Sequence, residues 1–416
     1  MYTLRRFHGS RFNRINAVID SLDGHLTSFV DLIGSATLPL PEVCAMQGLP
    51  GTACRVEGHP SARLFPGTDP MDEAESLIED ATRRLFGLDD GYDISAQPHS
   101  ATQANHAVFR ALLGEDGGTV AGLSPSDGGH ISHSLGVPAS SEFVSVSLDV
   151  EGIDYERLEQ DVRRHRPTIL VAGGTSYTRS IDYGRLRELA DHVGCHLHAD
   201  LAHTAPFIAS GLHSPAFPFV DSATIDPSKN LRGPAGGILI FREEDARKMK
   251  RAVFPVLQSA PNQPAMLAKA ACVSHWAEVS LRPYAELMVR HARILGERLE
   301  GLLGPQIYRQ TETHLLLFDL SALPIDGREA EAVLEGARVL ANRNQVPGDP
   351  KPPWAPSGMR FGTTVLAILE YDDDDVRDLG EAICSVLSGD LGHVDTIDRL
   401  LNAYHRPVVN SASEST

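Results

Sequence analysis

The stretch Ser222-Ala-Thr-Ile-Asp-Pro-Ser-Lys-Asn-Leu-Arg-Gly-Pro-Ala-Gly-Gly237 holds a lysine, Lys229, between a short apolar strand and a glycine-rich turn. A second apolar run, Ile238–Phe241, follows directly. A lysine that forms an imine must stand on a rigid element with its charge suppressed, whereas a surface lysine usually has polar, helix-favouring neighbours. The position of Lys229 therefore fits a Schiff-base lysine, and it also fits a solvated lysine at a strand end.

Asp200 makes the first reading more specific. It closes the apolar run Gly194–Asp200, and His203 follows it. The carboxyl end of a strand is where an open α/β sheet binds its ligands. A carboxylate there is suited to keep the ring nitrogen of pyridoxal phosphate protonated, which makes the ring an electron sink. Lys229 and Asp200 together indicate a pyridoxal-phosphate site, which neither residue does alone.

Apolar runs alternate with amphipathic helices on both sides of this region. Short apolar runs suit buried parallel strands, and their alternation with helices indicates an α/β sheet covered on both faces. The expected strands are Thr119–Leu123, Phe143–Leu148, Thr168–Ala172, Cys195–Ala199 and Ile238–Phe241, and the expected helices are Met71–Phe86 and Thr102–Leu113.

Beyond Arg242 the pattern changes to longer helices and indicates a smaller α+β domain. The helices expected there are Gln263–Trp276, Arg282–Leu303 and Asp373–Leu387, with a strand at Thr313–Asp319. We expect an N-terminal arm at 1–50, a large cofactor-binding domain at 51–250, a small C-terminal domain with a linking helix at 251–405, and a flexible tail at 406–416.

Composition excludes several classes of protein. The 416-residue chain has a formal net charge of −18 and no block of lysine and arginine, which argues against nucleic acid and anionic membranes as partners. Its five cysteines, odd in number and without a CxxC pair, predict neither a disulfide framework nor a zinc site, and we expect no metal. No targeting signal and no run of about 20 apolar residues is found, so we expect a cytoplasmic protein.

From about Asp31 to about Ser388 the chain resembles the serine hydroxymethyltransferase family. The matching segments occur in family order at family spacing: Gln97–Asn105, Gly128–His133, Asp200–His203, Leu231–Pro234 and Ser357–Gly362. The resemblance implies a fold-type-I pyridoxal-phosphate enzyme, with a mostly parallel sheet of the seven-stranded type in the large domain and a smaller α+β domain. It also implies a homodimer or homotetramer whose active sites are shared between chains.

The resemblance assigns residues to the cofactor. Ser100, Ala101 and Thr102 open a helix whose amino terminus favours a phosphate, although a plain helix cap would look the same. His130 matches the histidine that lies flat on the cofactor ring and also serves catalysis. Thr175 matches a hydroxyl near that ring, and His203 is expected to contact its phenolic oxygen. Asp200 and Lys229 complete the set, the lysine as the residue that holds the cofactor.

Other matching residues face the substrate. Arg360 follows the Pro-Ser-Gly loop, and its planar guanidinium suits an amino-acid carboxylate held by two hydrogen bonds. Glu57 matches a carboxyl group that reaches in from the neighbouring subunit and shuttles the proton of the substrate hydroxyl. We also assign Ser35, Arg55 and Phe65 to substrate binding.

The chain departs from the family pattern at several of these places. Asp226 and Ser228 replace residues that pack against the imine, and Ala235 replaces an arginine. Arg55 and Phe65 stand where the family has two phenols, and Leu64 stands where an aromatic ring stacks on folate. Losing that stack would weaken pterin binding by about 1 kcal/mol or more. Asn344, which matches a pterin-contacting residue, is retained.

These residues lead to a functional hypothesis. We expect an enzyme that forms or cleaves the Cα–Cβ bond of a β-hydroxy-α-amino acid through a glycine quinonoid, acting on an amino acid and an aldehyde. The departures favour a folate-independent aldolase or transaldolase over the tetrahydrofolate-dependent serine/glycine enzyme. A pyridoxal-phosphate aminotransferase or decarboxylase, and a non-catalytic binder of the cofactor, stay as alternatives.

Overall fold

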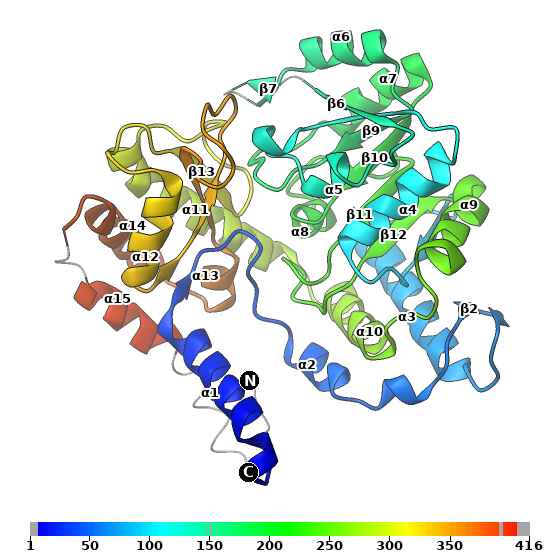
Figure 1. Ribbon diagram of the computed structural model, residues 1–416, viewed down its shortest axis with the longest axis horizontal. Helices are drawn as coiled ribbons and strands as arrows, with labels where there is room; N and C mark the ends of the chain where they lie inside the picture. Colours follow the sequence, from blue (N-terminus) through cyan, green and yellow to red (C-terminus); the bar gives the residue numbers. More distant parts are fainter. Residues whose placement is uncertain (1–6, 147, 150–151, 391–393, 406–416) are drawn as a thin grey trace. The chain divides into compact units, whose positions relative to one another are not determined.

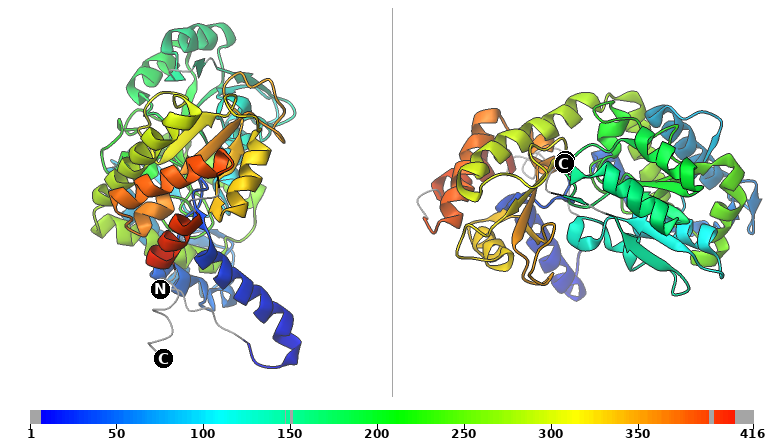
Figure 2. Two further views of the ribbon diagram at one scale, coloured as in Figure 1. Left: turned by 90° about the vertical axis from the view of Figure 1, so that its left-hand side faces the viewer. Right: turned by 90° about the horizontal axis from the view of Figure 1, so that it is seen from above.

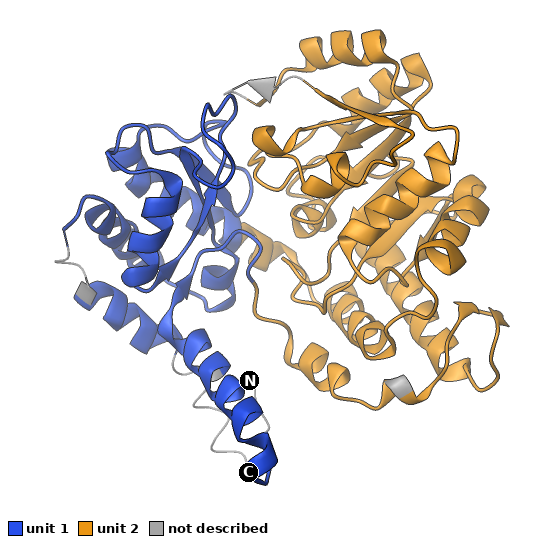
Figure 3. Ribbon diagram, viewed as in Figure 1, with its two compact units in different colours: residues 1–36, 287–416 blue, residues 37–286 orange. Residues whose placement is uncertain are grey.

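The chain divides into two units (Figure 3). The large unit contains residues 37–286, and the small unit contains residues 1–36 and 287–416. The computed structural model describes residues 7–146, 148–149, 152–390 and 394–405. The tail that was expected to be flexible, residues 406–416, lies outside the described residues.

A seven-stranded sheet is the centre of the large unit (Figure 1). β11, β10, β9, β5 and β6 run parallel in that order, while β12 is antiparallel to both β11 and β4. The α/β sheet predicted from the sequence is confirmed. Across the sheet the strands are β4 (Tyr92–Ser95), β12 (Ile238–Arg242), β11 (Ser222–Ile225), β10 (His196–Asp200), β9 (Ile169–Ala172), β5 (Thr119–Gly122) and β6 (Glu142–Ser145).

The prediction for the sheet is wrong in two details. Ile238–Phe241 was expected to be parallel, but β12 is antiparallel to β11 because the connection between them, residues 226–237, contains no helix to carry the chain back across the sheet. The run Phe143–Leu148 was expected to be buried. Its strand β6 is instead a partly exposed edge strand that pairs with β5 alone.

Helices cover the sheet of the large unit (Figure 2). α4 contacts β11 and β12, and α7 contacts β10. The apolar face of α4 joins β5, β9, β12 and α9 in one buried cluster that includes Val108, Val120 and Leu239. The helices of this unit are α2 (Pro41–Gln47), α3 (Asp69–Phe86), α4 (Ala101–Leu113), α5 (Ile131–Ser134), α6 (Tyr155–His165), α7 (Tyr183–Val193), α8 (Ala205–Ala209), α9 (Ala246–Arg251) and α10 (Gln263–Glu278).

α10 explains why the large unit extends beyond the expected boundary at 250. It packs on α3 and α2, and its buried Lys269 donates hydrogen bonds to the backbone oxygens of Ala96, Pro98 and Gly237 at 2.6, 3.0 and 3.0 Å. Three carbonyl oxygens match the three donors of an ammonium group. This buried contact fixes α10 to the loops beside β4 and β12.

The small unit has a three-stranded antiparallel sheet, β13 (Leu315–Asp319), β16 (Gly358–Gly362) and β15 (Asn342–Asn344). β1 (Val30–Asp31) pairs with β14 (Val339–Leu340), and Val30 and Leu32 are fully buried in this unit's core. The expected arm at 1–50 is therefore split, because its first part belongs to this core. The remaining helices are α1 (Asn13–Ser28), α11 (Arg282–Leu303), α12 (Gly327–Gly336), α13 (Thr364–Ile368), α14 (Asp373–Leu387) and α15 (Val394–Leu400). Across the described ranges, no helix has the length and apolar character needed to span a membrane.

Candidate active site

A cavity of about 110 Å³ lies in the large unit, at the carboxyl ends of its parallel strands. β9 leads into Gly174 and Thr175, β10 ends at Asp200, and β11 leads into Asp226 and Lys229. This edge of an open parallel sheet is the usual ligand site. The lining residues are Ser100, Ala101, Thr102, Asn105, His130, Gly174, Thr175, Asp200, Ala202, His203, Asp226 and Lys229. Every residue that the sequence assigned to the cofactor is therefore part of one cavity, although their roles stay predictions.

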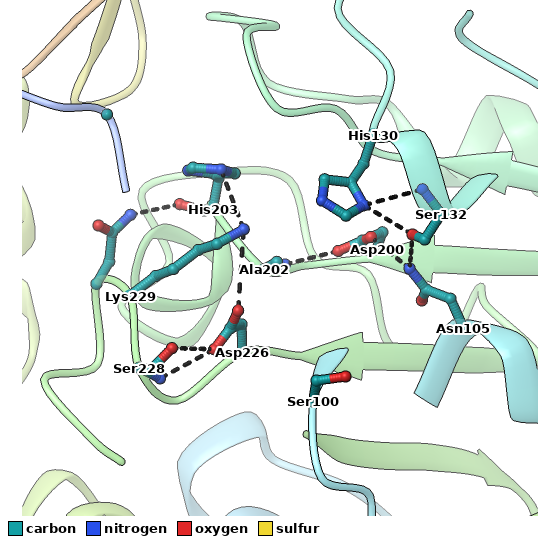
Figure 4. A network of polar contacts seen from close by, with 12 residues as sticks. Ser100, Asn105, His130, Ser132, Asp200, Ala202, His203, Asp226, Ser228 and Lys229 are labelled. Carbon is teal, nitrogen blue, oxygen red and sulfur yellow. Dashed lines mark hydrogen bonds and ion pairs between the residues drawn. The ribbon is translucent and has the colours of Figure 1, made fainter. Parts of the chain in front are cut away.

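Lys229 lies between a histidine and a carboxylate (Figure 4). Its Nζ is 3.2 Å from Nε2 of His203 and 3.9 Å from Oδ2 of Asp226. Asp226 is fixed by a local turn, because its Oδ1 accepts hydrogen bonds from the backbone N–H and the hydroxyl of Ser228 at 3.0 and 2.7 Å. The two residues that depart from the family pattern thus act together, and they direct the second oxygen of Asp226 toward the amine.

Asp200 is held as a buried carboxylate. Its Oδ2 accepts hydrogen bonds from Asn105 Nδ2 and His133 Nε2, both at 2.8 Å, and its Oδ1 accepts one from the backbone N–H of Ala202 at 3.0 Å. Burial would raise the pKa of Asp200, but the hydrogen bonds from His133 and Asn105 and the nearby positive charges hold it well below its usual value. An ionised carboxylate at this place is suited to pair with a protonated ring nitrogen.

The glycine after β9 makes room for this arrangement. Gly173 has φ +151°, and a Cβ at this position would lie 2.3 Å from the backbone oxygen of Asp200. A side chain here would displace the end of β10. The loop that carries Thr175 can therefore pass close to Asp200 only with glycine at this position.

His130 begins α5 and lies over the cavity (Figure 4). Its Nδ1 accepts the backbone N–H of Ser132 at 3.2 Å and contacts the Ser132 hydroxyl at 2.7 Å. The neutral ring therefore carries its proton on Nε2. Burial lowers the pKa of His130, so the neutral form, whose flat face can lie against an aromatic ring, is favoured near neutral pH.

The amino terminus of α4 supplies the predicted anion site. Ser100 is the N-cap residue, and its Oγ accepts the backbone N–H of Gln103 at 3.0 Å. The alternative reading of Ser100 as a helix cap is therefore confirmed. It does not exclude a phosphate, because the remaining N–H groups of the first turn and the helix dipole still favour an anion there.

The predicted carboxylate clamp belongs to the small unit. Arg360 lies in β16, is 8% exposed, and donates from Nε and Nη2 to Oδ1 of Asn342 at 3.2 and 3.0 Å. Burial lowers its pKa to about 10, so it stays charged at neutral pH. A Cβ on Gly34 would lie 2.8 Å from Arg360 Nε, which brings the exposed Ser35 close to the same side chain. The role of Arg360 and Ser35 in substrate binding stays a prediction.

Glu57, Arg55 and Phe65 do not line the cavity around Lys229. Glu57 precedes β2 (Gly58–His59), and Phe65 follows β3 (Ala62–Arg63). Arg55 is exposed, and Phe65 is 41% exposed. Exposure on a single chain agrees with the expectation that these residues serve a neighbouring subunit, and that expectation stays a prediction.

The sequence reasoning missed part of the network around Asp200. Asn105, Ser132 and His133 lie inside segments that carried the family resemblance, but none was assigned a role. Asn105 is one helical turn after Ala101, and His133 is three residues after His130, so each faces the same side of its element as a predicted site residue. That spacing was the available signal.

The chemistry of these groups fits pyridoxal phosphate. The cavity presents an amine for an imine, a buried carboxylate for the ring nitrogen, a helix amino terminus for the phosphate and an imidazole for the ring face. Each group of the cofactor thus has a partner of the right kind.

Comparisons with known proteins give an independent result. A family model described as serine hydroxymethyltransferase matches residues 13–383. Serine hydroxymethyltransferase 1 of Pseudomonas fluorescens is 34% identical over 375 residues, which make up 89% of this chain and 89% of that protein. Serine hydroxymethyltransferase of Polaromonas sp. is 34% identical over 395 residues, 94% of each chain.

Proposed function

Because the chain belongs to the serine hydroxymethyltransferase family of pyridoxal-phosphate-dependent transferases, we propose that it forms or cleaves the Cα–Cβ bond of a β-hydroxy-α-amino acid without tetrahydrofolate. The family match confirms the predicted resemblance, enzyme class, fold-type-I assignment and cofactor. The identity of the bond and the independence from folate are our proposal. The observation that carries the chemistry is the cavity that joins Lys229 and Asp200.

Each residue of the cavity has a proposed task. Lys229 attaches the cofactor, and the ionised Asp200 accepts a hydrogen bond from the ring nitrogen and keeps it protonated. The first turn of α4 binds the phosphate, and His130 orients the ring. Bound pyridoxal phosphate supplies an electron-withdrawing ring for the electron pair released when a bond to the substrate α-carbon breaks.

The substrate is held by residues outside this cavity. Arg360 binds the α-carboxylate through two charge-assisted hydrogen bonds and so fixes which bond to the α-carbon stands perpendicular to the ring. Glu57, supplied by a second subunit, accepts the proton of the β-hydroxyl as the aldehyde leaves. Arg55 adds a positive charge beside Glu57 and favours an acidic or phosphorylated aldehyde.

Independence from folate is supported by the hairpin that carries Leu64. An aliphatic side chain cannot stack on a pterin as an aromatic ring does. Leu64 is 64% exposed, and its backbone N–H donates to the oxygen of Glu57 at 2.9 Å, so the hairpin offers no ring at this position. The tetrahydrofolate-dependent reaction stays the second candidate, since Asn344 is retained and the two relatives are named as hydroxymethyltransferases.

The test uses purified holoprotein with and without tetrahydrofolate. We expect exchange of the α-proton of glycine and release of acetaldehyde from threonine in its absence. Added tetrahydrofolate should not speed the cleavage of serine. Lys229→Ala is the control, because it should lose both reactions together with the absorption of the lysine-bound cofactor. Strong stimulation by folate, or tight folate binding in calorimetry, would establish the second candidate instead.

A further inference from the structure

A line of polar side chains leads from the edge of the large unit's core to Asp200. His196, His198 and Asp200 alternate along β10, and side chains two apart on a strand share a face. His198 is fully buried, and burial lowers its pKa to about 3, so its ring is neutral at working pH. A neutral imidazole has one donor and one acceptor nitrogen.

The hydrogen-bond partners fix which nitrogen of His198 carries the proton. Asn105 Nδ2 donates to the carboxylate of Asp200, which can only accept, so the amide oxygen of Asn105 points the other way. That oxygen lies 3.0 Å from Nε2 of His198, which must therefore be the donor. Nδ1 of His198 then accepts from the hydroxyl of Ser222 at 2.8 Å. The orientation of every group from Ser222 to Asp200 follows from the charge of Asp200.

Asn105 also connects this line to His130. Its Nδ2 donates to Ser132 Oγ at 2.9 Å as well as to Asp200 Oδ2 at 2.8 Å. The Ser132 hydroxyl is then free to donate to Nδ1 of His130, 2.7 Å away. One amide thus orients both the carboxylate for the ring nitrogen and the histidine for the ring face (Figure 4).

We propose that His198, assisted by Ser222, is a positioning residue that holds the amide of Asn105 with its NH₂ group toward Asp200. If the amide turned over, its oxygen would face the carboxylate, and repulsion would favour the protonated form of Asp200. The relay therefore keeps Asp200 ionised and keeps the cofactor's ring nitrogen protonated. This inference rests on the proposed role of Asp200 toward the cofactor.

The experiment compares two histidines on the same strand. His198→Phe keeps an aromatic ring but removes the donor to Asn105. His196→Phe is the matched control, since His196 Nε2 also contacts Ser222 Oγ, at 2.8 Å, but Ser222 can still donate to His198 without it. Each holoenzyme is loaded with ¹⁵N-labelled pyridoxal phosphate, and the ring-nitrogen resonance and the rate of cofactor release are measured.

We expect His198→Phe to move the ring-nitrogen resonance toward its unprotonated position and to speed cofactor release by roughly tenfold, as for a buried polar group left without a partner. His196→Phe should behave as the unmodified chain. His198→Gln, whose amide can again donate to Asn105, should restore most of the signal. If His198→Phe does not fold, Ser222→Ala should show the same shift in smaller measure.

Asp200→Asn separates the two possible failures. If it leaves the resonance unchanged, Asp200 does not serve the ring nitrogen and the proposed site is wrong. If it moves the resonance while His198→Phe, or Ser222→Ala in its place, does not, the site is right and the relay is wrong. An equal shift in His196→Phe and His198→Phe would also overturn the proposal, because it would indicate a general effect on β10.

Discussion

Asp226 is the residue that most clearly sets this chain apart from its family. Its Oδ2 is 3.9 Å from the amine of Lys229, and Ser228 fixes its other oxygen. A carboxylate at that distance stabilises a positive charge on the nitrogen. The unit made by Asp226 and Ser228 thus favours the protonated form of the nitrogen that carries the cofactor.

We predict that Asp226→Asn will lower the pH at which the absorption band of the lysine-bound cofactor changes, because the neutral amide no longer stabilises the charged nitrogen. Spectrophotometric titration of the holoprotein measures this shift. Ser228→Ala should cause a smaller shift in the same direction, since it loosens Asp226 but keeps its charge. An unchanged titration in Asp226→Asn would show that the carboxylate does not act on Lys229.

At this scale the sequence was informative where a residue type stood at a strand end. Lys229 and Asp200 were found in this way, and the structure brings both into one cavity. His198 could not be found in the same way, because its importance depends on which helix covers that face of β10. The alternation of His196, His198 and Asp200 was visible as a polar face on a buried strand, but the partner Asn105 lies in a distant part of the sequence.

Among the elements, α4 carries most of the predicted cofactor contacts, and its cap can be tested. Ser100→Ala removes the side-chain acceptor for Gln103 N–H, which should cost about 1 kcal/mol of stability and also weaken cofactor binding. Urea denaturation and cofactor titration measure the two effects. Asp326→Ala is the control, because Asp326 caps α12 in the small unit through Arg328 and Glu329. It should lower stability by a similar amount without affecting the cofactor, and a loss of cofactor affinity in both variants would contradict the assignment.

Element boundaries were predictable where the pattern was long and periodic. α11 (Arg282–Leu303) and α14 (Asp373–Leu387) have the expected limits, and α3 begins only two residues before its expected start. Strand direction was not predictable from apolar runs, since the run that forms β12 would look the same in a parallel strand. Direction depended on the connection, which has no helix between β11 and β12.

In the whole molecule, the predicted substrate clamp and the cofactor cavity belong to different units. Arg360 lies in the small unit, and Asp200 and Lys229 lie in the large unit. The expected boundaries at 50 and 250 missed this division, because the partners of α10 and of Val30 are distant in sequence. A composition change marks where a pattern ends, whereas burial decides which unit a segment joins.

We predict that variants in the two units will affect different kinetic constants. Arg360→Ala should raise KM for amino acids about tenfold or more with little effect on cofactor retention, because two charge-assisted hydrogen bonds to the substrate are lost. Asp200→Ala should lower kcat even at saturating substrate, because the ring nitrogen loses its counter-charge. Steady-state kinetics with a β-hydroxy amino acid and a cofactor-release assay separate the two. Identical behaviour of both variants would contradict the division of roles.

The contact between Asp226 and Lys229 has a further consequence for how the active protein comes into being. Only an uncharged amine attacks the aldehyde of incoming pyridoxal phosphate, and the neighbouring carboxylate favours the ammonium form. A freshly synthesised chain should therefore load its cofactor slowly in mildly acidic solution and faster as the medium becomes alkaline. Maturation of this enzyme would then be governed by a single proton, which the chain must release before its first catalytic cycle.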